Sequence, residues 1–218
     1  MINKNTLWTF GDSYTFGFAC REDCPSGKAS KYIDEYRKDG DDIWPKLLSN
    51  DLNFNLKNFG KNAYCNYDII ESIIENIEDI NENDIVVIFK TLPHRIKHPK
   101  NNKWEFIPND ELLKSYKTNR GYENFTIEEI RAIISYWGIY VKEPAIKNRQ
   151  NKIFDYLISR IENDKKGIVL VEEVDFITGK YESIKEHTNG NIYDYHFSWN
   201  GHYDFYRNLK SKLDNKII

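Results

Sequence analysis

The sequence is poor in cysteine and carries almost no excess charge. Its 218 residues include only three cysteines (Cys20, Cys24 and Cys65), and they form no Cys-x-x-Cys pair. An odd set of this kind favours reduced thiols over a disulfide framework or a zinc site. The 31 basic and 34 acidic side chains leave a net charge of −3, and neither sign forms a long block. A nucleic-acid partner is therefore not expected, because its recognition normally needs a basic stripe.

Long apolar runs are also missing. No segment approaches the ~20 residues that a membrane span needs, and no apolar stretch near the N-terminus is long enough for a signal peptide. We therefore expect a cytoplasmic protein without a membrane span, while a virion protein or a non-standard export route stays open. A hydrophobic content of 40% and an aromatic content of 15% indicate a packed core. At this length a single domain over residues 1–218 is expected, and it needs no disulfide or metal for stability.

Short apolar runs alternate with segments of helical periodicity. The apolar runs predict buried strands at residues 6–10, 84–89 and 167–171, and a further strand is expected at about 54–59, ending at Gly60. Apolar residues at helical spacing predict a short helix from residue 43 and longer ones over about 67–80, 126–140, 146–163 and 198–213. This alternation predicts an α/β domain with a parallel sheet. The polar stretches 18–42 and 91–125 are expected to be surface insertions.

Three predicted strands are each followed by residues suited to a binding site. Gly11-Asp12-Ser13 follows the first strand, Gly60 the second and Thr91 the third. Parallel sheets bind ligands beyond the carboxyl ends of their strands, so we expect these segments to meet at one edge. Although Gly-Asp-Ser is also a common turn, a serine there can present its hydroxyl at the edge while its backbone N–H faces a developing oxyanion. Ser13 is thus a candidate nucleophile.

The segment Phe10-Gly11-Asp12-Ser13, followed by a further glycine, resembles the first block of the GDSL/SGNH hydrolases. Trp44-Pro45-x-Leu47-Leu48 is similar to the family's Trp-x-x-Leu-Leu helix, and Asn58-Phe59-Gly60 is similar to its second block. Near the C-terminus, Asp194-Tyr195-His196 and then Gly201-His202 resemble the last block. The resemblance implies a three-layer α/β/α sandwich with a central, mostly parallel five-stranded sheet (SGNH/flavodoxin-like).

The resemblance implies that Ser13 is the nucleophile and His196 its general base. An imidazole titrates near neutrality and can take the hydroxyl proton during attack. Asp194 would accept a hydrogen bond from the other ring nitrogen, and residues two apart in an extended stretch face the same side. Gly60 would supply a backbone oxyanion donor. The implied activity is hydrolysis of a short acyl or O-acetyl ester of a glycan or small molecule, through an acyl-serine intermediate and without a cofactor.

Two features depart from the family pattern. The family's third block, Gly-x-Asn-Asp, supplies an oxyanion donor from its asparagine, but here the third strand runs into Lys90-Thr91-Leu92-Pro93-His94-Arg95. We expect the hydroxyl or backbone of Thr91, or else Arg95, to replace it; otherwise activity is weak, since one lost donor costs roughly 10²–10³ in rate. Together with Gly60, Thr91 and Arg95, Asp12 is expected to belong to the oxyanion and substrate-binding residues. The family also usually separates Asp and His by two residues, whereas only Tyr195 intervenes here.

Other histidines and several aromatic residues are also candidates for a site, and most of them are expected to have structural roles. His94 and His98 have a spacing that binds metal on a helix, but the flanking Pro93 and Pro99 leave little helix, so no metal site is expected. His202 is expected to pack or to cap a helix rather than to act as a second base. Four aromatic residues are expected either to wall a substrate cleft or to anchor the long loop: Trp104, Phe106, Tyr116 and Tyr122.

Two functions remain open beside hydrolysis. The missing asparagine motivates a catalytically weak or inactive SGNH-like module that binds a glycan or a protein. The same serine could instead transfer an acyl group to or from a sugar. Binding without turnover would favour the module, and product analysis with an acceptor alcohol would identify a transferase.

Overall fold

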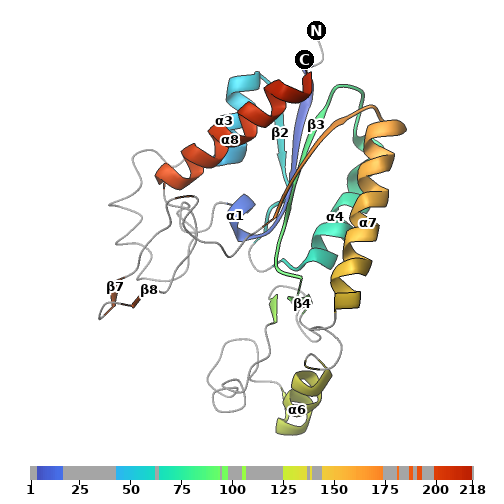
Figure 1. The fold of residues 1–218 in the computed structure, drawn as a ribbon, viewed down its shortest axis with the longest axis vertical. Coiled ribbons are helices and arrows are strands. Elements are labelled where there is room, and N and C mark those ends of the chain that lie inside the picture. Colours follow the sequence, from blue (N-terminus) through green and yellow to red (C-terminus); the bar gives the residue numbers. More distant parts are fainter. Residues whose placement is uncertain are drawn as a thin grey trace.

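The structure of the chain is a computed structural model. It describes residues 4–16, 43–61, 64–93, 95–97, 105–106, 125–136, 138, 144–173, 181, 187–188, 191–192 and 199–217. Every strand and helix predicted from the sequence is present and in the predicted order, and further short elements lie between them (Figure 1). The strands are β1 (Thr6–Phe10), β2 (Asn55–Asn58), β3 (Ile85–Lys90), β4 (Ile96–Lys97), β5 (Glu105–Phe106), β6 (Ile168–Glu173), β7 (His187–Thr188) and β8 (Asn191–Ile192). The helices are α1 (Ser13–Phe16), α3 (Trp44–Leu52), α4 (Asn66–Asn76), the 3₁₀ helix η1 (Ile77–Asp79), α6 (Ile127–Tyr136), α7 (Pro144–Asn163) and α8 (Trp199–Ile217).

Four strands form a parallel sheet in the order β2-β1-β3-β6. This confirms the predicted parallel architecture, but the described part of the chain contributes four strands to this sheet, not the five that the family resemblance implied. The patterns in the sequence itself predicted only these four strands. After β1, the chain forms β2 on one side of β1 and then β3 on its other side. The strand order therefore reverses between β1 and β3, and α/β sheets bind ligands at the carboxyl end of such a switch point.

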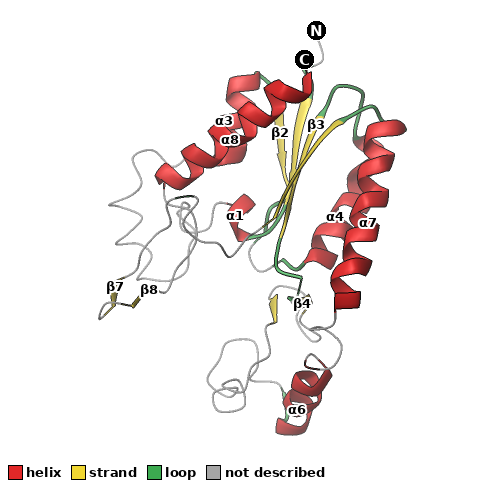
Figure 2. Ribbon diagram, in the orientation of Figure 1, coloured by secondary structure: helices red, strands yellow, loops and turns green. Residues whose placement is uncertain are grey.

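Helices cover both faces of the sheet (Figures 1 and 2). Successive strand residues point to opposite faces, so Trp8 packs with residues of α4 and α7, whereas Leu7 packs with residues of α3 and α8. All residues of β3 except the last are buried, as expected for a strand covered on two sides. The predicted α/β/α layering is confirmed.

A buried carboxylate joins two strands at the amino edge of the sheet. Asp84, only 3% exposed, accepts hydrogen bonds from the Thr6 N–H at 2.7 Å and the Trp8 Nε1–H at 2.9 Å, both in β1. It also accepts the N–H of Asn81, in the segment before β3, at 3.0 Å. Asp84 thus ties β1 to the start of β3, at the end of the sheet opposite the ligand edge.

The helix expected over 67–80 is α4, and its last predicted turn is the 3₁₀ helix η1. The insertion expected at 18–42 lies outside the described residues. Within the other insertion, 91–125, β4 and β5 form a short antiparallel pair. None of the helices in the described ranges is long and apolar enough to cross a membrane.

Candidate functional site

Ser13 lies at the point where the strand order reverses. It is the first residue of α1, directly after β1, and its exposed fraction is 6%. Thr91 directly follows β3, the neighbour of β1 in the sheet. Residues 11–16, the Ser13 turn, meet the segment after β3 through a hydrogen bond of 2.7 Å from the Thr91 hydroxyl to Asp12 Oδ2. The carboxyl ends of the two strands therefore share one polar cluster.

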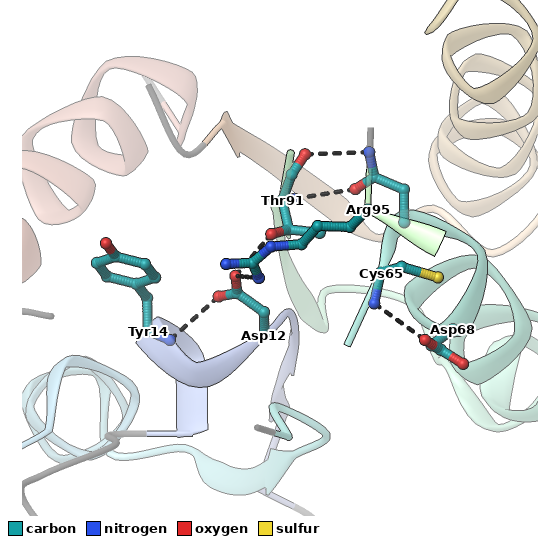
Figure 3. Close-up of polar contacts among 7 residues, drawn as sticks. Asp12, Tyr14, Cys65, Asp68, Thr91 and Arg95 are labelled. Carbon is teal, nitrogen blue, oxygen red and sulfur yellow. Dashed lines mark hydrogen bonds and ion pairs between the residues drawn. The ribbon is translucent and has the colours of Figure 1, made fainter. Parts of the chain in front are cut away.

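Asp12 holds the Ser13 turn in place. Its carboxylate is fully buried and accepts three hydrogen bonds: from the Thr91 hydroxyl, from Arg95 Nη1 at 2.8 Å and from the Tyr14 N–H at 3.1 Å (Figure 3). One side chain therefore restrains the backbone on both sides of Ser13 and ties it to the segment after β3. A buried carboxylate is tolerated when it is paired and hydrogen-bonded, and Asp12 meets both conditions.

The ion pair with Asp12 holds the Arg95 guanidinium beside the Ser13 turn. The Arg95 side chain is 12% exposed and that of Asp12 is not exposed at all, so salt screens the pair only weakly. A cation fixed at this place can stabilise negative charge that develops near the serine. Thr91, by contrast, donates its hydroxyl to Asp12 and its N–H to Asn66 Oδ1 at 2.9 Å. Both hydrogen-bond donors of Thr91 are thus bound within the protein.

Gly60 lies against α1, and a neighbouring side chain binds its N–H. That N–H donates to Asn58 Oδ1 at 2.9 Å, in a local turn closed by a side chain two residues back. Asn58 also accepts the Thr9 hydroxyl at 3.0 Å and donates from Nδ2 to the Thr15 carbonyl at 3.1 Å. A Cβ at position 60 would lie 2.5 Å from the Phe16 nitrogen, so only glycine fits this close to α1.

Trp44 connects the Ser13 turn to the C-terminal helix. Its Nε1–H donates to the Tyr14 carbonyl at 3.2 Å, and its backbone N–H donates to His202 Nδ1 at 3.4 Å. The second bond occupies an N–H in the first turn of α3, where the helix itself offers no acceptor. His202 is 1% exposed, and its predicted role in packing or capping is confirmed.

The predicted base and acid, His196 and Asp194, lie outside the described residues. So do several other residues singled out in the sequence: His94, His98, Cys20, Cys24, Trp104, Tyr116 and Tyr122. Phe106 lies in β5. Across the described ranges, no group of His, Cys, Asp or Glu side chains is arranged to hold a metal ion.

From the sequence, Asn58 was noted only as part of the segment Asn58-Phe59-Gly60, with no role of its own, and Asn66 was not noted at all. Asn58 ends β2, and Asn66 opens α4. Backbone groups beyond the last bonds of a sheet need other partners, and short amides at strand ends and helix starts often provide them. The place of each asparagine, at the end of a predicted strand or the start of a predicted helix, could have indicated its role. This indication is weak in a chain so rich in asparagine.

Cys65, which precedes α4, is fully buried, and its N–H donates to Asp68 Oδ2 at 2.9 Å (Figure 3). Burial first, and then the nearby Asp68 charge, raise the pKa of its thiol from 9.0 to about 12. The thiolate is the reactive form, so we expect iodoacetamide to leave native Cys65 unlabelled even at about pH 10, where an ordinary thiol is largely ionised. Mass spectrometry of the Cys65 peptide checks this, with guanidinium-unfolded protein as the control. Rapid labelling of the native protein would contradict the prediction.

The chain matches no protein-family profile and no curated protein. Similar solved structures include a protein described as lipolytic, of the G-D-S-L family, from Desulfitobacterium hafniense DCB-2, at 13% identity and a TM-score of 0.35 over 95% of this chain and 98% of that one. A carbohydrate esterase, whose active site is described as displaying divergent catalytic and non-catalytic binding functions, is 10% identical, with a TM-score of 0.42 over 98% of this chain and 69% of its own. A member of the lipolytic protein G-D-S-L family from Veillonella parvula DSM 2008 is 13% identical, with a TM-score of 0.33 over 94% and 96% of the two chains. With all three TM-scores below 0.5, the function of this chain has to be argued from its own residues.

Proposed function

We propose that the chain is a serine-dependent ester hydrolase with Ser13 as nucleophile. The observation that carries this proposal is the restrained turn at the switch point. Asp12 is buried and binds both the Thr91 hydroxyl and Arg95, which holds the backbone of Ser13 at the edge where α/β sheets bind ligands. A nucleophile on a preorganised turn needs little reorientation during attack.

His196 is the proposed general base. It precedes α8 by three residues, and the two hydrogen bonds of Trp44 tie α8, through His202, to the Ser13 turn. Six steps of chain separate His196 from His202, a length that spans at most roughly 20 Å. A base at position 196 is therefore tethered within that distance of His202. Asp194 is the proposed acceptor for the other ring nitrogen of the imidazole.

Arg95 is the proposed replacement for the missing oxyanion donor. Its ion pair with Asp12 keeps the guanidinium beside the Ser13 turn, whereas both donors of Thr91 are bound within the protein. Arg95 would act together with the backbone N–H of the nucleophile itself. The N–H of Gly60 donates to Asn58, so it would contribute only after that bond opens.

The proposed reaction transfers an acyl group to serine and then to water. His196 takes the proton of the Ser13 hydroxyl as its oxygen attacks the ester carbonyl carbon, and a tetrahedral oxyanion forms. The ester C–O bond then breaks, the alcohol leaves with the proton from His196, and the acyl group remains on Ser13. Water gives a proton to His196 as its oxygen attacks the acyl-serine, and a second tetrahedral oxyanion forms. The bond to the Ser13 oxygen then breaks, His196 returns the proton to Ser13, and the acid is released. The proposed substrate is a short acyl or O-acetyl ester of a glycan or small molecule.

Hydrolysis of p-nitrophenyl acetate and butyrate by the wild-type and His196→Ala proteins tests the proposal. We expect wild-type turnover and a loss of roughly 10³-fold or more in the variant, because the serine loses its base. Mass spectrometry after a rapid quench should find an acyl group on the peptide that contains Ser13. The ratio of acetate to butyrate rates measures the size of the acyl pocket. A folded wild-type protein that hydrolyses neither ester would contradict the proposal.

A non-catalytic module that binds a glycan or a partner protein is the second candidate. The bond from the Gly60 N–H to Asn58 favours it, because a donor held within the protein does not stabilise an oxyanion. Glycan binding without turnover, equal in the wild-type and Ser13→Ala proteins, would support this function. Acyl transfer to an alcohol would use the same serine as hydrolysis, and product analysis with an acceptor alcohol separates those two reactions.

A further inference from the structure

Asn66 binds both polar groups of the Thr91 backbone. It opens α4 and is 3% exposed. Its Oδ1 accepts the Thr91 N–H at 2.9 Å, and its Nδ2 donates to the Thr91 carbonyl at 3.0 Å. Thr91 lies one residue beyond the end of β3. The Asn66 amide therefore takes the place of a neighbouring strand at the edge where Ser13 lies.

A second buried amide fixes the orientation of the first. Asn66 Nδ2 also donates to Gln150 Oε1 at 3.1 Å, and Gln150 Nε2 donates to the Pro93 carbonyl at 3.3 Å. Gln150 belongs to α7 and is 1% exposed. An amide nitrogen has two hydrogens, and both hydrogens of Asn66 Nδ2 are used here. Two helices, α4 and α7, thus hold the segment after β3 by side-chain amides.

Thr91 passes this restraint on to the Ser13 turn. The Asn66 amide holds the backbone of Thr91, and the Thr91 hydroxyl donates to Asp12 Oδ2 at 2.7 Å. Asp12 in turn accepts the N–H of Tyr14, on the far side of the serine. Four residues linked by these hydrogen bonds are each at most 4% exposed: Asp12, Asn66, Thr91 and Gln150. Hydrogen bonds in such dry surroundings are strong and are costly to leave unmade.

We propose that Asn66 is a positioning residue for Ser13, acting through Thr91 and Asp12, with Gln150 as its support. The inference rests on the proposed function, since it concerns how the nucleophile is aimed. A shift of about 1 Å in a reacting group lowers a rate about 10²-fold. Loss of the Asn66 bonds should therefore lower kcat and leave KM nearly unchanged, because the substitution alters the aim of the serine and not the groups that bind the ester.

The Asn66→Asp variant tests this with little change in shape. The carboxylate keeps an acceptor for the Thr91 N–H but loses the donor to the Thr91 carbonyl and to Gln150. We expect kcat for p-nitrophenyl acetate to fall about 10- to 100-fold. Asp84→Asn is the matched control, because Asp84 is equally buried but lies at the opposite edge of the sheet. It should lower the melting temperature and leave the kcat of the folded protein unchanged.

Amide hydrogen exchange provides a readout that needs no turnover. In Asn66→Asp the N–H of Tyr14, which is bound by Asp12 and not by Asn66 itself, is expected to exchange faster than in the wild type, and in Asp84→Asn at the wild-type rate. If the wild type hydrolyses no ester, the proposed function fails, and the Tyr14 exchange rate still decides whether Asn66 restrains the turn.

Three results would overturn the inference. They are an unchanged Tyr14 exchange rate in Asn66→Asp, a wild-type kcat in that variant, and an equal loss of kcat in Asp84→Asn. Should Asn66→Asp fail to fold, Gln150→Ala removes only the supporting amide. It is expected to lower kcat and to speed Tyr14 exchange in the same direction by a smaller factor, and no change in either would count against the inference.

Discussion

Replacement of Ser13 by alanine is expected to abolish ester hydrolysis. In the proposed mechanism only this hydroxyl forms the acyl intermediate, and loss of such a nucleophile costs roughly 10³-fold or more in kcat. The free energy of unfolding should change little, because one oxygen is removed and Asp12 still holds the turn through Thr91 and Arg95. Initial rates over a range of p-nitrophenyl acetate concentrations, together with thermal unfolding, measure both quantities.

Ser49 provides a matched control for this substitution. It is also buried, at 3% exposed, and its hydroxyl donates to the Lys46 carbonyl within α3 at 3.0 Å. Ser49→Ala removes the same atom at a distance from the Ser13 turn and should leave hydrolysis unchanged. Wild-type turnover by Ser13→Ala would exclude Ser13 as the nucleophile.

Replacement of Asp12 by alanine is expected to destabilise the fold strongly. Asp12 is fully buried, and one of its oxygens lies 2.8 Å from Arg95 Nη1. Removal of one member of a buried ion pair costs about 3–5 kcal/mol, because the remaining charge loses its counter-charge. The Thr91 hydroxyl and the Tyr14 N–H lose their acceptor as well. Urea unfolding followed by tryptophan fluorescence measures the loss in the free energy of unfolding.

A more conservative variant, Asp12→Asn, separates charge from shape. It keeps an oxygen acceptor but removes the charge that holds Arg95, so we expect a smaller loss of stability together with a large loss of activity. Glu78→Gln is the control: Glu78 pairs with Arg160, also at 2.8 Å, but its side chain is 68% exposed. Solvent screens such a pair, so the free energy of unfolding should hardly change. If Asp12→Asn and Glu78→Gln lowered the free energy of unfolding equally, burial of the Asp12–Arg95 pair would not explain its contribution to stability.

The elements of the fold could be predicted from local patterns. The run predicted as a strand over 84–89 is β3, Ile85–Lys90, and the other strands of the parallel sheet also lie within two residues of their predicted places. A strand covered on both faces needs a continuous apolar run, and a helix on a sheet needs an apolar stripe. Both signals lie within a few neighbouring residues, so no knowledge of distant contacts is needed to detect them.

The polar partners at the sheet edge could not be predicted in this way. Asn66 and Gln150 are 84 residues apart in the sequence, and Asp12 and Arg95 are 83 apart. Each pair forms only because the topology brings separate elements to one edge. The Asn58 bond to the Gly60 N–H is the exception, since it spans two residues and an asparagine shortly before a strand-ending glycine could have suggested it.

The sequence by itself determined the α/β class, the parallel sheet and the order of strands and helices along the chain. It also determined that Ser13 and Thr91 lie at the carboxyl edge of the sheet. Hydrophobic periodicity decides these features, because burial of apolar side chains is the main force that places helices against strands. Only the tertiary structure decided that Asp12 binds Arg95, and that Asn66 holds Thr91. A buried polar group needs a partner within about 3 Å, and the fold, not the order of residues, selects which group lies there.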